Sequence, residues 1–304
     1  MKPLIAVLIP CYNEEAAIEA VVRDFRQALP EANIFVYDNN STDRTREVAL
    51  AAGAIVRTEP LQGKGNVVRR MFADIEADVF VLVDGDNTYD AGSAPKLVDL
   101  LLRDGLDMVN ASRVASSDLA YRAGHQFGNA MLTGIVAQIF GNRLRDMLSG
   151  YRVFSRRFVK SFPALAGGFE TETEFTVHAL ELRLPIAEVP TPYRERPAGS
   201  VSKLRTYRDG IRILRMIITL IKQERPLQFF ACISGLLALI SVVLAVPVVQ
   251  TYLNTGLVPR LPTAVLSMGI MLLSFLSLMC GLILETVRFD SWVSPRFQPL
   301  RSRS

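Results

Sequence analysis

Cysteine and histidine are scarce in this sequence of 304 residues, which contains three of the former and two of the latter. Cys11, Cys232 and Cys280 form no spacing pattern, so the sequence indicates neither a disulfide framework nor a zinc site. His125 and His178 lie far apart, without a cysteine or histidine neighbour at the spacing of metal ligands. We therefore expect both histidines to be surface or packing residues.

Two glycine-rich phosphate motifs are also missing. No Gly-x-Gly-x-x-Gly follows the first predicted strand, and no Walker sequence occurs anywhere in the chain. A Rossmann dinucleotide site and a P-loop are thus not supported. If this protein binds phosphate groups, it must hold them in another way.

Charged residues are absent from two long stretches, Leu227–Val249 and Thr263–Leu284. Each stretch is long enough to cross a bilayer core of roughly 30 Å at about 1.5 Å per residue. A buried core helix is the alternative explanation for either one, but two such segments in succession disfavour it. The sequence therefore predicts two transmembrane helices.

The basic residues around these spans predict their orientation. They precede the first span and follow the second, whereas the connecting loop contains Arg260 alone. The flanking residues are Lys203, Arg205, Arg208, Arg212, Arg215, Lys222 and Arg225, and then Arg288, Arg296, Arg301 and Arg303. No signal-peptide pattern precedes the first strand. We expect a multi-pass protein of the inner membrane whose catalytic domain and termini are cytoplasmic. The net charge of +4 then indicates contact with an anionic bilayer, not with nucleic acid.

Residues 1 to about 225 have an ordinary globular composition, with strands and helices in alternation. Strands are predicted at 4–9, 34–37, 54–57, 79–83, 107–111 and 186–189, and helices at 14–29, 65–77 and 94–104. This alternation is typical of an α/β domain with a Rossmann-like, mostly parallel sheet. A further segment, 203–226, combines apolar and basic residues at helical spacing and predicts an amphipathic interfacial helix. A helix packed on the soluble domain is the alternative.

The strand at Val79–Val83 ends directly at Asp84-Gly85-Asp86. Ligands of open α/β sheets bind at the carboxyl ends of strands, and two nearby carboxylates can hold a hard divalent cation. The pattern therefore suggests a cation that holds a diphosphate. A solvated acidic turn would be the better explanation for an isolated Asp-x-Asp, so neighbouring motifs must decide.

Five motifs occur in order along the chain. They are Ile9-Pro10-Cys11-Tyr12-Asn13-Glu14-Glu15, Asp38-Asn39-Asn40-Ser41-Thr42-Asp43-Arg44-Thr45, Gly63-Lys64-Gly65-Asn66, Asp84-Gly85-Asp86 and Ser149-Gly150-Tyr151-Arg152. Together they resemble the family 2 inverting glycosyltransferases with the GT-A fold, in particular the dolichol- or polyprenyl-phosphate sugar synthases. The resemblance covers residues 4 to about 205. It implies a GT-A domain at 1–202. The residue patterns described above add the interfacial helix at 203–226, transmembrane helices at 227–249 and 263–284, and a basic cytoplasmic tail at 285–304.

The resemblance also implies a binding site for a nucleotide-sugar. Pro10, Tyr12, Glu14 and Asp38 would line the base and ribose pocket, with Lys64 near the nucleotide. Asp84 and Asp86 would act in catalysis by holding Mg²⁺ or Mn²⁺ on the diphosphate. Two positions depart from the family pattern: Asn39 stands where a second acid is usual, and Thr88 where a Gln is frequent. The first departure leaves the preferred nucleotide base undecided, and the second puts a metal-ligand role for Thr88 in doubt.

The acceptor side is implied by the same resemblance. Arg113 and Arg122 match acceptor-phosphate residues, as less closely do Arg196 and Lys203, with Ser149 as a further phosphate ligand. Asp146 matches an acid kept near the sugar, and it would act in catalysis by orienting the sugar or the acceptor. Without the resemblance, each arginine would be better explained as a solvated surface charge. Glu170, Glu172 and Glu174 either include a ligand of sugar hydroxyls or form a charged helix N-terminus stabilised by the helix dipole.

Elementary chemistry agrees with this assignment. A nucleoside diphosphate leaving a sugar needs its negative charge neutralised, which a bound cation does without a proton. A lipid phosphate is already an anion and needs no strong base. It needs basic residues, because two anions repel each other by about 1 kcal/mol in water and roughly 4 kcal/mol at an effective dielectric constant near 20.

We therefore predict transfer of a sugar from a nucleoside diphosphate, by preference a UDP-hexose, to undecaprenyl or dolichyl phosphate at the cytoplasmic face. A separate flippase would move the product. One alternative is a GDP-mannose-dependent mannose synthase. Another is a processive or lipid-saccharide glycosyltransferase, which the lone Trp292 disfavours because it lies outside any Gln-x-x-Arg-Trp-like element. A third is a membrane scaffold with an inactive nucleotide-binding fold. The oligomeric state, including a homo-oligomer, is left open.

Overall fold

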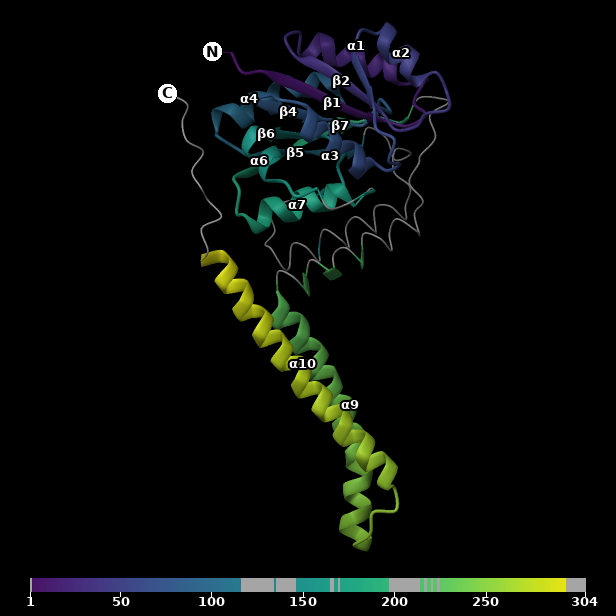
Figure 1. Cartoon of the computed structure of the whole chain (residues 1–304), viewed down its shortest axis with the longest axis vertical. Coiled ribbons are helices and arrows are strands. Elements are labelled where there is room, and N and C mark those ends of the chain that lie inside the picture. Colours follow the sequence, from purple (N-terminus) through teal and green to yellow (C-terminus); the bar gives the residue numbers. More distant parts are fainter. Residues whose placement is uncertain are drawn as a thin grey trace. The chain divides into compact units, whose positions relative to one another are not determined.

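The computed structural model describes residues 2–115, 134, 146–164, 167–168, 170–196, 214–215, 218–219, 221–222 and 225–293. The chain forms two compact units, Met1–Met216 and Ile217–Ser304, each of which is drawn in Figure 1. The interfacial helix predicted at 203–226 lies mostly outside the described residues. The tail at 285–304 lies outside them beyond residue 293.

The first unit is built on a sheet whose strands run in the order β3-β2-β1-β4-β6-β5-β7 among the described residues. The strands are β1 (Ile5–Cys11), β2 (Asn33–Asp38), β3 (Ile55–Thr58), β4 (Val79–Leu82), β5 (Met108–Ala115), β6 (Arg152–Ser155) and β7 (Ile186–Tyr193). All neighbouring pairs are parallel except those that β6 makes with β4 and with β5. The prediction of a mostly parallel sheet is confirmed.

Helices cover both faces of this sheet (Figure 1). The helices are α1 (Ile18–Ala28), α2 (Thr45–Ala51), α3 (Lys64–Asp74), α4 (Ala94–Arg103), α6 (Arg156–Ser161) and α7 (Thr171–Glu181), with a short 3₁₀ turn at Ala91–Ser93. One hydrophobic core joins α1, α2 and α4 to the sheet, and the other joins α3, α6 and α7 to the opposite face. The unit is therefore a three-layer α/β/α sandwich.

The side-chain periods of strand and helix explain these layers. In β4, Val79 and Val81 belong to one core while Phe80 and Leu82 belong to the other, because successive strand residues point to opposite faces. In α1, the buried residues recur at helical spacing, as Ile18, Val21, Val22 and Phe25. The strand β4 is apolar on both faces and therefore lies inside the sheet. Polar residues follow soon after its last residue.

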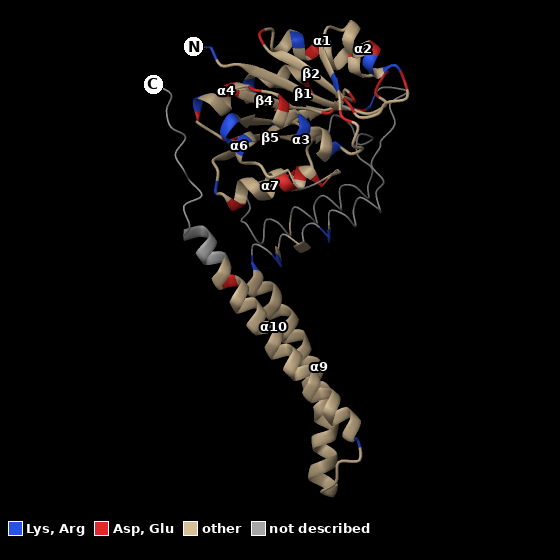
Figure 2. Cartoon of the chain, viewed as in Figure 1, with Lys and Arg blue, Asp and Glu red and all other residues tan. Residues whose placement is uncertain are grey.

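From residue 225 to residue 293, the second unit forms two antiparallel helices, α9 (Pro226–Thr255) and α10 (Leu261–Val293). Both are long enough and apolar enough to cross a membrane, and they extend beyond the predicted spans at 227–249 and 263–284. Figure 2 shows that they carry almost no charge: α9 has no charged residue, and the first in α10 is Glu285.

Serines hold the two helices together at buried positions spaced by seven residues. Ser274 donates a hydrogen bond to the backbone oxygen of Ser234 at 2.8 Å, and Ser241 donates to that of Ser267 at 2.7 Å. Small residues let helix backbones approach closely, and a hydroxyl that finds its partner across the interface leaves no polar group facing lipid. The apolar side chains of the pair point outward, including Leu239, Val243 and Leu276.

Candidate active site

Three neighbouring strands end in polar turns at the same edge of the sheet. The register places Cys11 of β1 beside Asp38 of β2, and β4 lies on the other side of β1. Each turn contains an asparagine in the left-handed conformation, a region that Asn tolerates better than most residues: Asn13, Asn40 and Asn87. These turns deliver the predicted donor-site acids to one place.

The charges of these acids influence the buried thiol of Cys11. Burial raises its pKa well above the ordinary value, and the negative charges of Glu14, Asp38, Asp84 and Asp86 raise it further. The charges of four predicted site residues therefore act on one side chain. Of the other predicted nucleotide-pocket residues, Pro10 is part of β1 and Tyr12 is exposed just beyond it.

Lys64 forms ion pairs with two acidic side chains. Its ammonium donates to Asp84 at 2.5 Å and also pairs closely with Glu172 on α7. Burial disfavours the charged form, but the charges of Asp84 and Glu172 outweigh that effect and raise the pKa of Lys64. Burial raises the pKa of Glu172, whose second carboxylate oxygen, Oε2, is buried and has no hydrogen-bond partner among the residues that the structure describes. Lys64 thus stays charged at the edge of the site.

Asp86 is also engaged through both of its carboxylate oxygens. Oδ1 accepts hydrogen bonds from the Thr88 hydroxyl at 2.6 Å and the Thr88 backbone N–H at 3.2 Å, while Oδ2 lies 2.7 Å from Nη2 of Arg196. Burial and the charge of Asp84 raise the pKa of Asp86, although Arg196 acts in the opposite direction. Two carboxylates close enough to influence each other are thus balanced by two cations of the chain.

Gly150 lets the next loop approach Asp84. A Cβ atom on Gly150 would overlap Oδ2 of Asp84, so a larger residue would move the carboxylate. The backbone N–H of Gly150 donates to the buried hydroxyl of Tyr89 at 2.8 Å, which fixes the loop in place. Gly150 is therefore a site residue that sequence reasoning missed, although it belongs to one of the recognised motifs.

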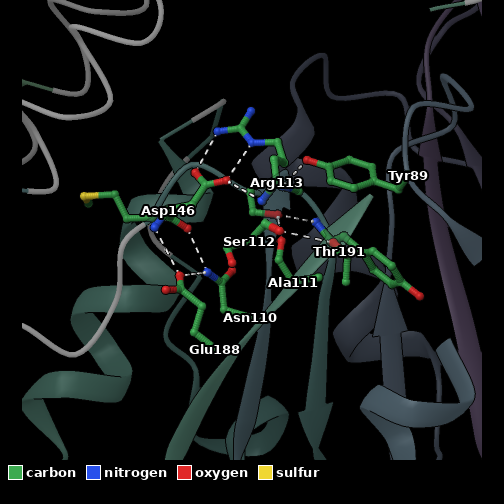
Figure 3. Close-up of polar contacts among 12 residues, drawn as sticks. Tyr89, Asn110, Ala111, Ser112, Arg113, Asp146, Glu188 and Thr191 are labelled. Carbon is green, nitrogen blue, oxygen red and sulfur yellow. Dashed lines mark hydrogen bonds and ion pairs between the residues drawn. The ribbon is translucent and has the colours of Figure 1, made fainter. Parts of the chain in front are cut away.

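Arg113, which is partly buried, and the buried Asp146 form a bidentate ion pair (Figure 3). Nε and Nη2 of Arg113 each lie 2.7 Å from a carboxylate oxygen of Asp146, and the Arg113 backbone N–H donates to the same group at 3.1 Å. Glu188 accepts from the backbone N–H of Asp146, and Asn110 donates to the backbone oxygen of Asp146 and to Glu188. The predicted acceptor-side arginine and the predicted sugar-side acid therefore act as one unit.

The loop that follows is held from inside the protein. Ser149 is fully buried, and its hydroxyl donates to the backbone oxygen of Ala111 at 2.6 Å. Arg152, also fully buried, donates to the backbone oxygens of Met147 and Ser149 and to the hydroxyl of Thr176 on α7. Burial lowers the pKa of Arg152 to about 10. This placement gives Ser149 a structural role, and its contact with an acceptor phosphate stays a prediction.

Asn39 orders the segment that leads to Lys64. Its side-chain amide donates to the backbone oxygens of Glu59 and Leu61, each at 2.8 Å, and accepts from the N–H of Gly63 at 2.7 Å. A carboxylate could not donate to those two oxygens. The departure from the family's paired acids is therefore explained locally, because position 39 requires an amide.

Asn39→Asp is expected to destabilise the protein by about 2–4 kcal/mol, since two buried hydrogen bonds become repulsive contacts between oxygens. The midpoint of thermal unfolding of the full chain in detergent should fall clearly. Asn40→Asp is the matched control, because Asn40 is exposed and donates to the backbone of Pro60. Equal midpoints for the two variants would contradict this role of Asn39.

Two of the predicted acceptor residues, Arg122 and Lys203, lie outside the described residues. The structure thus brings Glu14, Asp38, Lys64, Asp84 and Asp86 together, adds Arg196 to them, and places Arg113 with Asp146.

Comparison with known proteins identifies the family of this chain. The family model described as Glycosyl transferase family 2 matches residues 6–162, more than half of the chain. The protein belongs to glycosyl transferase family 2. The matched region includes β1 to β6 and both Asp84 and Asp86.

Two relatives each match about three quarters of this family 2 glycosyltransferase. It is 37% identical to the glycosyltransferase AglJ of Haloferax volcanii over 232 residues, or 76% of each chain. It is 30% identical to a dolichyl-phosphate hexose transferase of the same organism over 221 residues, or 73% of this chain and 95% of the relative. The expected enzyme class, a glycosyltransferase, is thereby confirmed.

A solved structure shows the same GT-A fold. Glucosyl-3-phosphoglycerate synthase from Mycobacterium tuberculosis, in complex with Mn²⁺, UDP and glucosyl-3-phosphoglycerate, superimposes with a TM-score of 0.59 at 26% identity. The match covers 72% of this chain and 79% of that protein. The prediction of a GT-A domain followed by two apolar helices is therefore confirmed.

The donor atoms at β4 of this glycosyltransferase suit a divalent cation. Asp84 and Asp86 supply hard carboxylate oxygens, and within the described ranges no group of three or more His, Cys, Asp or Glu side chains could hold a metal ion. Mg²⁺ is commonly bound by one or two carboxylates, with substrate phosphates and water as the other ligands. The residues present fit Mg²⁺ or Mn²⁺ held jointly by the protein and a diphosphate.

Proposed function

We propose that this glycosyltransferase moves a hexose from a UDP-hexose to a polyprenyl phosphate such as undecaprenyl or dolichyl phosphate, with inversion at the sugar carbon. The observation that carries the proposal is the pairing of Asp84 with Lys64 and of Asp86 with Arg196 at the carboxyl end of β4. This arrangement offers carboxylates to a cation and cations to phosphates. The relative named dolichyl-phosphate hexose transferase and the neighbouring structure with Mn²⁺ and UDP support it.

The donor half of the reaction uses the acids and Lys64. When the sugar–phosphate bond breaks, the nucleoside diphosphate leaves with the bonding electron pair. Mg²⁺ or Mn²⁺, held by Asp84 and Asp86 when bound, supplies neutralisation of that charge. Lys64 is a second, permanent cation beside Asp84, and it needs no reorganisation when the charge develops.

The kind of acceptor is suggested by the ion pairs of Asp146 and Glu172. Asp146 accepts two hydrogen bonds from the Arg113 guanidinium, and Glu172 is paired with Lys64. Both carboxylates are thus already paired with cations of the chain, whereas an alcohol acceptor would need a free base to remove its proton. A phosphate monoester is already an anion. The geometry therefore favours a lipid phosphate over the hydroxyl group of a lipid-linked saccharide.

The two apolar helices would hold the catalytic unit at the membrane, where such an acceptor lies. We propose that α9 and α10 span the bilayer, with the catalytic unit and both termini in the cytoplasm. The flanking Lys and Arg residues, against Arg260 alone in the connecting loop, support this orientation. No charged residue lies in α9 or in the 261–284 part of α10. This fits an anchor better than a polar conduit, so a separate flippase would move the product.

The test is a screen of UDP-hexoses and GDP-mannose with a short polyprenyl phosphate, in which the mass of the product is measured. We expect one UDP-hexose to give a hexosyl polyprenyl phosphate, only when Mg²⁺ or Mn²⁺ is present. A product from GDP-mannose alone would favour a mannose synthase. Transfer to a lipid-linked saccharide, without any product on the lipid phosphate, would contradict the proposal. The purified Asp86→Asn protein controls for contaminating enzymes.

A further inference from the structure

The segment that ends β7 lies along the turn that follows β4. Tyr193 forms an antiparallel bridge with Tyr89, and the backbone N–H of Arg194 donates to the backbone oxygen of Thr88 at 2.8 Å. The Arg194 guanidinium pairs with Asp90 at 3.0 Å. The backbone contacts of Tyr193 and Arg194 place Arg196 beside Asp86.

Both carboxylate oxygens of Asp86 already have partners in this arrangement. Thr88, only two residues away, holds Oδ1 through its backbone and its hydroxyl. Arg196, more than one hundred residues away, holds Oδ2. The Asp86 side chain is 5% exposed, but that of Arg196 is 31% exposed. A divalent cation that binds Asp86 can therefore displace Arg196 toward solvent more easily than it can undo the local turn.

We propose that Arg196 is an internal counter-ion of Asp86 that a divalent cation displaces, and that its released guanidinium then binds the acceptor phosphate. This inference rests on the proposed function. It makes donor loading the first step of an ordered sequence, because the arginine becomes available to a phosphate only after the cation has taken its carboxylate.

The other acceptor-side groups support this assignment to Arg196. Arg113 is held by both carboxylate oxygens of Asp146, and Asp146 is not among the proposed ligands of the cation. The hydroxyl of Ser149 is buried against the backbone oxygen of Ala111. Among the described acceptor candidates, Arg196 is the one whose partner is also a proposed metal ligand. The exchange also avoids leaving a charge uncompensated, since each group that loses a partner gains another of the same sign.

The first test measures Mn²⁺ binding to the full chain in detergent, from the loss of the electron paramagnetic resonance signal of free Mn²⁺. Arg196→Gln removes the competing cation. We expect it to bind Mn²⁺ about tenfold more tightly than the wild type, a factor that one charge-assisted hydrogen bond commonly contributes. Arg194→Gln, whose partner is Asp90, should leave the affinity unchanged. Unchanged or weaker Mn²⁺ binding by Arg196→Gln, or no binding by either protein, would overturn the proposal.

The second test measures the affinity for a short polyprenyl phosphate, with and without Mn²⁺ and UDP. The wild type should bind it more tightly when both are present, and Arg196→Gln should lose this dependence. The same dependence in both proteins would overturn the ordered sequence. The Mn²⁺ measurement involves no acceptor and no turnover. Tighter Mn²⁺ binding by Arg196→Gln, with no lipid-phosphate product in the nucleotide-sugar screen, would therefore separate a failure of the proposed function from a failure of the counter-ion exchange.

Discussion

Asp86→Asn is expected to lower the rate of sugar transfer by at least about 10²-fold, with little loss of stability. The amide oxygen can still accept the hydrogen bonds from Thr88, so the turn should fold. The charge that would hold a cation against the leaving diphosphate is lost, and one transition-state interaction of this kind is commonly worth 10²–10³-fold in rate. Steady-state kinetics and thermal unfolding of the same samples measure both quantities.

Asp90→Asn is the matched control for Asp86→Asn. Asp90 lies four residues after Asp86 and pairs with Arg194, outside the proposed cation site. It should retain most of the activity. Comparable activities of the two variants would remove the assignment of Asp86 to a catalytic cation.

Gly150→Ala should also reduce transfer, by about 10²-fold, although it introduces one methyl group. That group would overlap the carboxylate of Asp84, which would have to turn away from Lys64 and from the proposed cation. A displacement of about 1 Å in a catalytic group can cost a factor of this size. Affinity for the nucleotide in the presence of Mn²⁺ should fall together with the rate.

Gly105→Ala separates crowding at the site from backbone strain. Gly105 has a positive φ of 61°, so alanine is strained there, but apart from its chain neighbours no described residue lies within 4 Å of its Cβ position. We expect Gly105→Ala to lower stability slightly and to leave the rate near that of the wild type. If Gly150→Ala had the same small effect, close approach of the loop to Asp84 would not matter for catalysis.

The sequence predicted the parallel half of the sheet because each of those strands is a short apolar run that ends in a polar turn. Val79–Val83 is the clearest case, and β4 ends one residue earlier, at Leu82. The strand β6 (Arg152–Ser155) was missed for a physical reason. It has four residues, begins with a buried arginine and lies antiparallel between β4 and β5, so its pattern is not that of an apolar strand. Its position depends on contacts distant in sequence.

The site was predictable only in part for the same reason. The acids Asp84 and Asp86 stand out in the sequence because they follow a buried strand. Their partners do not, since Lys64 lies 20 residues from Asp84 and 108 from Glu172. The roles of Asn39 and Gly150 depend on backbone atoms of other segments, which no sequence pattern reveals. The single signal for either was its place in a recognised motif.

The central claim is that Asp84 and Asp86 hold a divalent cation that binds the donor's diphosphate. The most direct measurement is calorimetric titration of the full chain with UDP, and in parallel with GDP, in Mn²⁺ and in chelator. The account predicts that Mn²⁺ strengthens binding of the preferred nucleotide to the wild type, and that Asp86→Asn loses this effect. Equal nucleotide affinity with Mn²⁺ and with chelator, or the same effect of Mn²⁺ on Asp86→Asn, would contradict it.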